Sequence, residues 1–286
     1  MGCGTWTTSS YLNYSTSKGR TVTDKGVLAG NYSAQDLYTF KRLQKELNPL
    51  NAMRECCDTE EHPNTTPVIL ALDVTGSMGD AAVQIAKKLN VVMTELYEKV
   101  SDVEFLIMGI GDLAYDDAPI QASQFESDIR IAEQLDKVYF EFGGGGNSFE
   151  SYSAAWYFGL YHTKLDCWKR NKKGLIITIG DELLNPYLPV GSLTVTTGDN
   201  LQTDVQTQKL FDAASQKFDI YHLNVKHGMW VDSETNENSF KKIIGEQCVK
   251  TVDVDSIADA IINIVTAHSR DEYCSNNTAT SGEISW

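Results

Sequence analysis

The residues best suited to chemistry lie in the stretch VILALDVTGSM, residues 68–78, where an apolar run stops at an aspartate. Asp73, Thr75 and Ser77 follow one another at alternate positions, so we expect their side chains to point together. Carboxylate and hydroxyl oxygens suit a hard cation such as Mg²⁺, which keeps several waters and requires near-octahedral geometry. The stretch therefore predicts an oxygen-lined cation site.

The surrounding pattern predicts how this site is positioned. An apolar run with β-branched residues, a glycine and a long amphipathic segment are typical of a strand, a tight turn and a helix. Asp73 then ends the strand, and open parallel α/β sheets bind ligands at the carboxyl ends of their strands. Asp80 falls in the first turn of the helix, where we expect a capping role. The helix has an apolar stripe made of Ala81, Ala82, Ile85, Leu89, Val92, Met93 and Leu96.

Two further polar loops follow strand candidates. GGGGNSFES, residues 143–151, precedes a predicted helix at residues 152–161. TIGDE places Asp181 directly after a strand candidate. Additional strand candidates are residues 103–110, 137–142, 175–179 and 220–225, and a closing helix is predicted at residues 257–267.

The motif D-x-[ST]-G-S at residues 73–77 resembles the first metal-binding loop of von Willebrand factor type A (vWA) domains. The resemblance implies an α/β fold, doubly wound and Rossmann-like, with a mostly parallel central sheet flanked by helices. It also implies a metal-ion-dependent adhesion site (MIDAS), in which Thr75 and Ser77 ligate the metal and Asp73 holds waters around it. Asp181 resembles the distal aspartate of that family.

The glycine-rich loop departs from the usual family pattern. Family members place a threonine after the glycines, whereas this chain has Asn147 and Ser148, followed by Glu150. The loop is similar to a subgroup with the pattern GGG-[DN]-x-x-E. Asn147 is the first candidate for the third ligand, with Ser148 and Glu150 as alternatives. Asp112 follows another strand candidate and either overlooks the same crevice or belongs to a solvated acidic loop.

Composition narrows the classes of partner. The chain has 286 residues and a net charge of -15, from 24 Lys and Arg against 39 Asp and Glu, which argues against nucleic acid as a partner. No apolar run approaches the ~20 residues that cross a bilayer, and the amino terminus shows no export signal. We therefore expect a cytoplasmic protein with no membrane segment. The six cysteines lack C-x-x-C spacing and are predicted to be reduced thiols.

Three segments are expected along the chain. Residues 1–66 form an N-terminal extension packed on the core, with one helix at residues 35–47. Residues 67–269 form the vWA-like domain, with a long polar insertion at residues 185–203 beside the metal crevice. That insertion carries Tyr187, Leu188, Pro189 and Val190 as candidate partner contacts. Residues 270–286 form a polar, mobile tail.

The leading functional hypothesis is a non-enzymatic, metal-dependent protein-binding module. The family uses an open coordination position on Mg²⁺, or on Mn²⁺ or Ca²⁺, to bind an Asp or Glu of a partner protein. By analogy alone, such a module serves as an adaptor or scaffold in a larger intracellular assembly, for example beside an AAA+ ATPase. A Glu150 carboxylate in the inner sphere would weaken this grip and favour a structural metal.

Two alternatives come from other classes. DVTGSM also resembles the DKTGT loop of the haloacid dehalogenase superfamily, in which Asp73 would be a phosphoryl-accepting nucleophile beside Mg²⁺. Asp181 would then belong to the last acidic motif, and Lys172 or Lys173 would be its lysine. Against this hypothesis, Thr75 stands where phosphatases have a second aspartate. The other alternative is a structural subunit with a vestigial metal loop.

Overall fold

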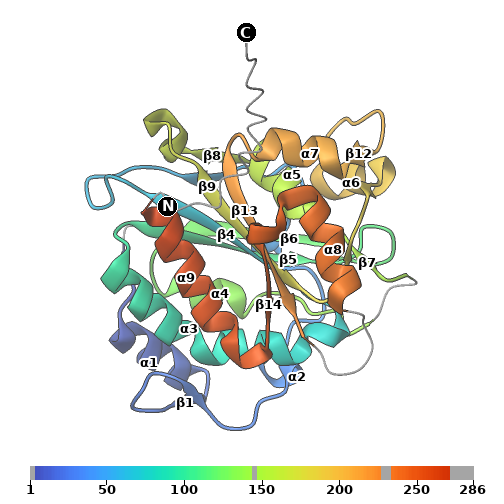
Figure 1. The fold of residues 1–286 in the computed structure, drawn as a ribbon. Coiled ribbons are helices and arrows are strands. Elements are labelled where there is room, and N and C mark those ends of the chain that lie inside the picture. Colours follow the sequence, from blue (N-terminus) through green and yellow to red (C-terminus); the bar gives the residue numbers. More distant parts are fainter. Residues whose placement is uncertain (1–3, 144–146, 227–232, 271–286) are drawn as a thin grey trace.

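A six-stranded sheet forms the centre of the computed structural model, which describes residues 4–143, 147–226 and 233–270 (Figure 1). The strands lie in the order β14-β13-β9-β4-β5-β6. Every neighbouring pair is parallel except β5 and β6. The bounds are β4 (Thr66–Asp73), β5 (Val103–Ile110), β6 (Ile120–Glu126), β9 (Gly174–Gly180), β13 (Phe218–Val225) and β14 (Val249–Val252).

This strand order is that of a doubly wound fold. The first three strands run outward from β4 to one edge, and the next three run outward from β9 to the other. Folds of this kind bind ligands at the carboxyl ends of the strands where the order reverses, which here is between β4 and β9. The fold class expected from the sequence is confirmed.

Helices cover both faces of the sheet, so β4, β5, β9 and β13 are buried along nearly their whole length. On one face α3 packs beside α9, and on the other α5 packs beside α7 (Figure 1). The helices are α1 (Thr8–Ser17), α2 (Ala34–Leu37), α3 (Gly79–Lys99), α4 (Arg130–Leu135), α5 (Ser153–Tyr161), α6 (Val190–Thr197), α7 (Thr207–Ala214), α8 (Ser233–Ile244) and α9 (Ile257–Ser269).

Four two-stranded ladders surround the main sheet. Two are antiparallel, β1 (Thr21–Val22) with β2 (Leu28–Ala29) and β11 (Tyr187–Leu188) with β12 (Val205–Gln206). Two are parallel, β3 (Arg54–Cys56) with β8 (Thr163–Leu165) and β7 (Phe149–Glu150) with β10 (Leu183–Leu184). The pairing of β7 with β10 joins the segment after the glycine-rich loop to the segment after Asp181.

The third strand of the main sheet is not where the sequence predicts it. Residues 137–142 form no strand, and β6 takes the edge position instead. The sequence does not reveal β6 as a strand because several of its side chains are polar. Inside the fold these side chains form hydrogen bonds with backbone groups. Gln121 donates to the Tyr139 carbonyl at 2.7 Å and accepts from its N–H at 2.9 Å, and Ser123 accepts from the Ile107 N–H at 2.8 Å.

Two other expectations are also wrong. The helix predicted at residues 35–47 is only α2 and a separate 3₁₀ turn, Lys45–Leu47, because the chain turns away where Tyr38 is buried against α3. Tyr38 donates to the Ala82 carbonyl at 3.0 Å. The polar insertion contains α6 between two short strands, and Leu188 is buried in the core instead of facing a partner.

The N-terminal segment shares the core of the sheet domain. Trp6, Tyr11 and Leu37 belong to the same cluster of buried apolar side chains as the central strands. The Trp6 indole also donates to the Asn90 side chain on α3 at 3.0 Å. The domain boundaries at residues 66 and 269 remain predictions, and residues 271–286 of the expected tail lie outside the described residues.

The cysteines are not all reduced thiols. Cys56, Cys57 and Cys167 are free, whereas Cys248 is disulfide-bonded. The expectation of six reduced thiols is therefore wrong at Cys248, and Cys3 and Cys274 lie outside the described residues. Within residues 4–143, 147–226 and 233–270, no helix has the length and apolar character needed to cross a membrane.

His222, buried in β13, makes the stability of the fold sensitive to acid. It bonds to the Thr178 hydroxyl at 2.9 Å and stacks on Phe240, and burial lowers its pKa to about 3 from the ordinary 6.5. Below pH 6.5 the unfolded chain takes up a proton that the folded chain refuses, so the free energy of unfolding falls from about pH 6.5 towards pH 3. We expect His222→Gln to flatten this part of the profile in urea denaturation at a series of pH values. Identical slopes for both proteins would contradict the assignment.

Candidate metal centre

Asp73 ends β4 with its carboxylate turned into the protein and fully buried. Its Oδ1 accepts hydrogen bonds from the Thr75 N–H at 2.9 Å and the Thr75 hydroxyl at 2.6 Å. Its Oδ2 accepts from the Tyr152 hydroxyl at 2.7 Å. An aspartate that bonds two residues ahead folds the chain into a tight turn, which is how DVTGS leaves the strand.

The other predicted oxygens continue from this carboxylate in a chain. The Thr75 hydroxyl lies 3.4 Å from the Ser77 hydroxyl, which donates to Asp181 Oδ1 at 3.0 Å. Thr75 and Asp181 are buried, whereas Ser77 is exposed. The structure thus brings four predicted site residues together across the β4–β9 switch point, with one open side towards solvent.

Gly76 is required because the glycine-rich loop comes very close to the DVTGS turn. The Gly76 N–H donates to the Gly143 carbonyl at 3.1 Å. A Cβ at Gly76 would lie 3.0 Å from the Phe142 carbonyl oxygen, closer than side chains normally approach backbone. Beyond this turn α3 begins, with Asp80 exposed in its first turn as expected. The N-cap residue is Met78 and the described residues provide no side-chain capping hydrogen bond there, so Asp80 favours the helix end only through its charge.

Two residues that the sequence analysis missed fix the loop after β9. The Tyr152 hydroxyl accepts a hydrogen bond from the Glu182 N–H at 3.2 Å and donates one to Asp73. This side chain therefore connects the end of β4 with the loop after β9. Asn236 on α8 donates to the Asp181 carbonyl. The sequence carries no signal for either residue, because their roles depend on contacts across 79 and 55 positions of the chain.

The three candidates for the third ligand differ in their surroundings. Asn147 donates to Asp112 Oδ2 at 2.8 Å and accepts from the Phe149 N–H at 2.7 Å, so its amide is already engaged. Ser148 is exposed. Glu150 is buried, and its Oε2 has no hydrogen-bond partner among the described residues. Residues 144–146 of the glycine run lie outside the described residues.

Asp112 belongs to the buried surroundings of the site and not to a solvated loop. It is 1% exposed, accepts from the Ala114 N–H at 2.8 Å, and holds the Asn147 amide. The adjacent Asp116 carboxyl accepts from the Asp112 N–H at 2.6 Å. The alternative that Asp112 itself is solvated is therefore wrong, whereas Tyr115 and Asp117 beside it are exposed.

The site concentrates acidic groups that favour the neutral form. Burial raises the pKa of Asp73 to about 7, and Asp181 adds to the shift. Burial raises the pKa of Asp181 to about 6, against the opposing hydrogen bond from Ser77. For Glu150, burial and then the Asp73 carboxyl raise the pKa to about 11. Neighbouring carboxyls raise the pKa values of Asp73 and Glu150 further, and a bound cation would favour the charged forms of these acids.

The donor set is suited to a hard cation. It consists of carboxylate and hydroxyl oxygens, the ligands that Mg²⁺, Mn²⁺ and Ca²⁺ prefer. Oε2 of Glu150 is a further buried oxygen, without a hydrogen-bond partner in the part of the chain that the structure describes. The described residues contain no group of three or more His, Cys, Asp or Glu side chains placed to hold a metal ion. A cation here would therefore depend on the hydroxyls of Thr75 and Ser77.

The lysines required by the phosphoryl-transfer hypothesis lie at the other edge of the sheet. Lys172 and Lys173 precede β9, whereas Asp181 follows it, and β9 runs parallel to β4. A strand of this length spans about 20 Å at ~3.3 Å per residue, which separates the lysines from Asp73. The assignment of either lysine to that superfamily's motif is wrong.

Comparisons with known proteins find solved structures of similar fold but no matching family. No family model matches the chain, and no curated protein matches it. The fold is similar to the pilus adhesin SpaC from Lactobacillus rhamnosus GG in its open conformation, with 12% identity and a TM-score of 0.47 over 78% of this chain and 31% of that chain. A second SpaC structure gives 14% identity and a TM-score of 0.45 over the same shares.

The vWF domain of the type V pili tip protein Mfa5 from Porphyromonas gingivalis has 12% identity and a TM-score of 0.46, over 72% of this chain and 96% of that domain. The chain thus spans only 31% of the length of SpaC. The chemistry of the site is inferred from its own geometry and not from these similarities.

Tyr152→Phe tests how the Asp73 carboxylate is held. The substitution leaves one buried carboxylate oxygen without its donor, which costs about 1–3 kcal/mol of unfolding free energy. We expect this loss in urea denaturation of the metal-free protein. Tyr161→Phe is the control, because Tyr161 is 54% exposed and its change should stay within about 0.5 kcal/mol. Equal effects of the two substitutions would mean that the Tyr152 hydrogen bond contributes nothing.

Proposed function

We propose that this chain is a metal-dependent protein-binding module, in which a MIDAS-type Mg²⁺ site binds an Asp or Glu of a partner protein. The observation that carries the proposal is the continuous run of oxygens from Asp73 through Thr75 and Ser77 to Asp181. It lies at the switch point of a doubly wound sheet and has one exposed member.

In this proposal the hydroxyls of Thr75 and Ser77 ligate the cation, and the carboxylates of Asp73 and Asp181 hold its waters. Mn²⁺ and Ca²⁺ are alternative occupants, since both accept the same oxygen donors. Neutral hydroxyl ligands leave most of the cation charge uncompensated. The bound metal would therefore attract a carboxylate from outside through the open side of the site.

Among the third-ligand candidates, the surroundings favour Glu150 over Asn147 and Ser148. Asn147 is held by Asp112, and Ser148 is exposed, whereas Glu150 carries the buried oxygen without a partner. A Glu150 carboxylate beside the metal would strengthen metal binding and weaken the attraction for a partner's carboxylate. Metal retention and partner binding therefore depend on Glu150 in opposite directions.

The competing hypotheses are weaker on specific grounds. Phosphoryl transfer lacks the lysine that its motif requires, because Lys172 and Lys173 lie at the opposite end of the sheet from Asp73. A vestigial loop offers no reason for these oxygens to lie together at the switch point of the sheet.

Two further expectations concern the partner protein and the cellular compartment. An adaptor role beside an AAA+ ATPase rests on the family analogy alone. The expected cytoplasmic location is not supported, because Cys248 is disulfide-bonded and disulfides persist mainly in oxidising compartments.

Metal binding is tested by calorimetric titration of Mg²⁺ and Mn²⁺ into wild type and Asp73→Asn. We expect saturable binding in wild type and at least about a tenfold loss of affinity in the variant, equivalent to ~1.4 kcal/mol or more. Asp80→Asn is the matched control. It removes the same charge from an exposed residue that lies a few positions further along the chain. Glu150→Gln should also weaken metal binding. No binding by wild type, or equal losses in Asp73→Asn and Asp80→Asn, would contradict the proposal.

Partner recognition is tested with a displayed library of short peptides selected on the Mg²⁺-loaded protein. We expect the selected peptides to carry an Asp or Glu whose replacement by Asn or Gln removes binding, because only the charged oxygen completes the coordination. Binding should disappear in EDTA and in Ser77→Ala. Selection of the same peptides in EDTA would mean that binding does not require the metal, which favours the structural-subunit hypothesis. Asp73-dependent hydrolysis of an aryl phosphate would favour the enzyme.

A further inference from the structure

Exposed apolar side chains gather on three adjoining segments of the chain. Among the described residues, seven large apolar or aromatic side chains are exposed, and four of these are Leu50, Met53, Tyr161 and Val195. They belong to the loop 48–53, to the carboxyl end of α5 and to α6. Apolar residues exposed singly are normal, whereas a group of them marks an interaction site. We call these four residues the α5–α6 patch.

Backbone hydrogen bonds fix the loop against both helices. The Asn51 N–H donates to the Thr197 carbonyl at the end of α6 at 2.8 Å. The Arg54 N–H donates to the His162 carbonyl after α5 at 2.9 Å. His162 also bonds to the Ala52 carbonyl through Nδ1 at 2.9 Å. The segments that carry the patch are therefore held together before any partner arrives.

Asp199 joins the ends of the two helices. Its carboxylate accepts from the Tyr157 hydroxyl of α5 at 2.5 Å and from the Thr197 hydroxyl of α6 at 3.0 Å. It also lies 2.7 Å from Nε2 of His162. A surface that is ordered in this way loses little conformational entropy on binding, which favours association.

The outer face of α6 is apolar without contributing to the core. Leu193 and Thr197 are buried four residues apart on its inner face, and Val195 lies midway between them in sequence, on the outer face. Val195 is 78% exposed. A β-branched residue is a poor helix former, and the solvent side of a helix normally carries polar residues. Packing within the chain and helix propensity therefore do not explain Val195, whereas contact with another molecule does.

Two ion pairs border the patch. Glu55 and Lys164, which are register partners in β3 and β8, lie 3.3 Å apart. Glu46, in the 3₁₀ turn before the loop, lies 3.2 Å from Lys137. Ion pairs that solvent reaches are weak, so these side chains can exchange partners at little cost. An apolar centre with a polar rim is the usual construction of a protein interface.

We propose that the α5–α6 patch is the centre of a two-fold interface between two copies of this chain. Both copies use the same surface in such an interface, so its rim must offer both signs of charge. This rim does so, because Lys164 of one copy can meet Glu55 of the other. A different partner selected by charge would favour a rim of one sign.

The size and charge of the surface predict a reversible dimer. Permanent dimers commonly bury about 2,000 Å² or more, whereas this interface has four partly exposed apolar side chains at its centre. Each copy also carries a net charge of -15, which opposes association. We therefore expect a dissociation constant in the micromolar range, about 1–100 µM.

The interface is separate from the metal centre. Tyr152, which contacts Asp73, lies directly before α5, whereas Tyr161 ends this helix of nine residues. At ~1.5 Å per residue the two ends of the helix are about 13 Å apart. A dimer formed at the carboxyl end of α5 therefore does not require the metal, and the proposal is independent of the proposed metal-dependent function.

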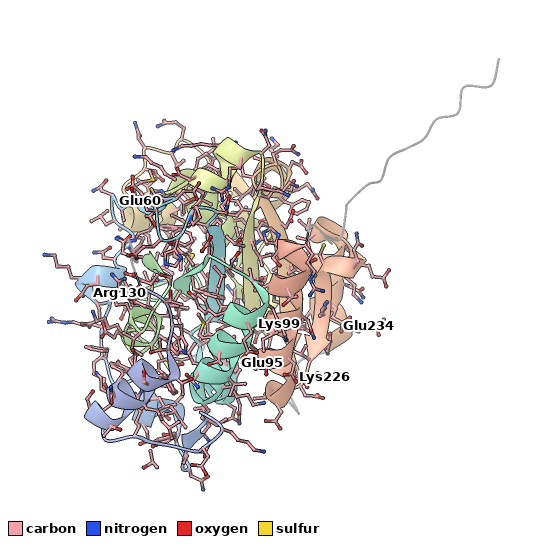
Figure 2. All side chains as sticks on the ribbon, turned by 90° about the vertical axis from the view of Figure 1, so that its left-hand side faces the viewer. Glu60, Glu95, Lys99, Arg130, Lys226 and Glu234 are labelled. Carbon is pink, nitrogen blue, oxygen red and sulfur yellow. The ribbon has the colours of Figure 1, made fainter. Side chains whose placement is uncertain are left out.

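The test is sedimentation equilibrium of the full chain at about 1–200 µM, in EDTA and at about 0.15 M salt to screen the repulsion between acidic copies. We expect a monomer–dimer equilibrium. Val195→Lys should weaken the dimer at least about tenfold, because it buries a charge at the centre of the interface. Glu95→Gln is the matched control, since it changes the net charge equally from α3, on the other face of the sheet. Figure 2 shows Glu95 beside Lys99 on that helix.

Three results would overturn the proposal. A wild-type protein that is monomeric at every concentration would leave the patch to another protein. Equal dissociation constants for Val195→Lys and Glu95→Gln would place the dimer contact elsewhere. Association beyond the dimer would exclude a closed two-fold interface. Circular dichroism establishes that each variant is folded, and Leu50→Ser, on a different segment of the patch, should also weaken the dimer at least about threefold.

Discussion

The buried carboxylate of Asp73 is the constraint on which the rest of the site depends. It ends the first strand of a doubly wound sheet and accepts three hydrogen bonds, two from Thr75 and one from Tyr152. These bonds shape the turn that presents Ser77, and Tyr152 ties the same carboxylate to the loop carrying Asp181. Burial of the carboxyls of Asp73, Glu150 and Asp181 raises their pKa values, so these groups resist ionisation.

Parallel strands explain why different kinds of side chain gather at the two ends of one sheet. All carboxyl ends of β4, β9 and β13 lie together, and so do all amino ends. Asp73 and Asp181 lie at the carboxyl ends, whereas Lys172 and Lys173 precede the amino end of β9. About 20 Å of strand separates the two groups.

Sequence and structure agree most closely where local pattern and burial coincide. The apolar runs that became β5, β9 and β13 are buried on both faces, so composition alone marks them. They disagree at β6, where Gln121 and Ser123 bond to backbone in the interior, and at residues 35–47, where burial of Tyr38 ends a helix that local pattern favours. The disulfide-bonded Cys248 likewise has no local signature.

The sequence by itself determined the α/β class, the strand–turn–helix unit around Asp73, and the identity of the oxygen-bearing residues at strand ends, because each depends on periodicity and spacing over a few residues. Only the tertiary structure decided which side chains meet. Tyr152, Glu182 and Asn236 join the site through contacts between distant segments, Asn147 turns to Asp112, and Glu150 is left with an unpaired oxygen. Burial and the proximity of like charges, which set the pKa values of these acids, arise only when the segments pack together.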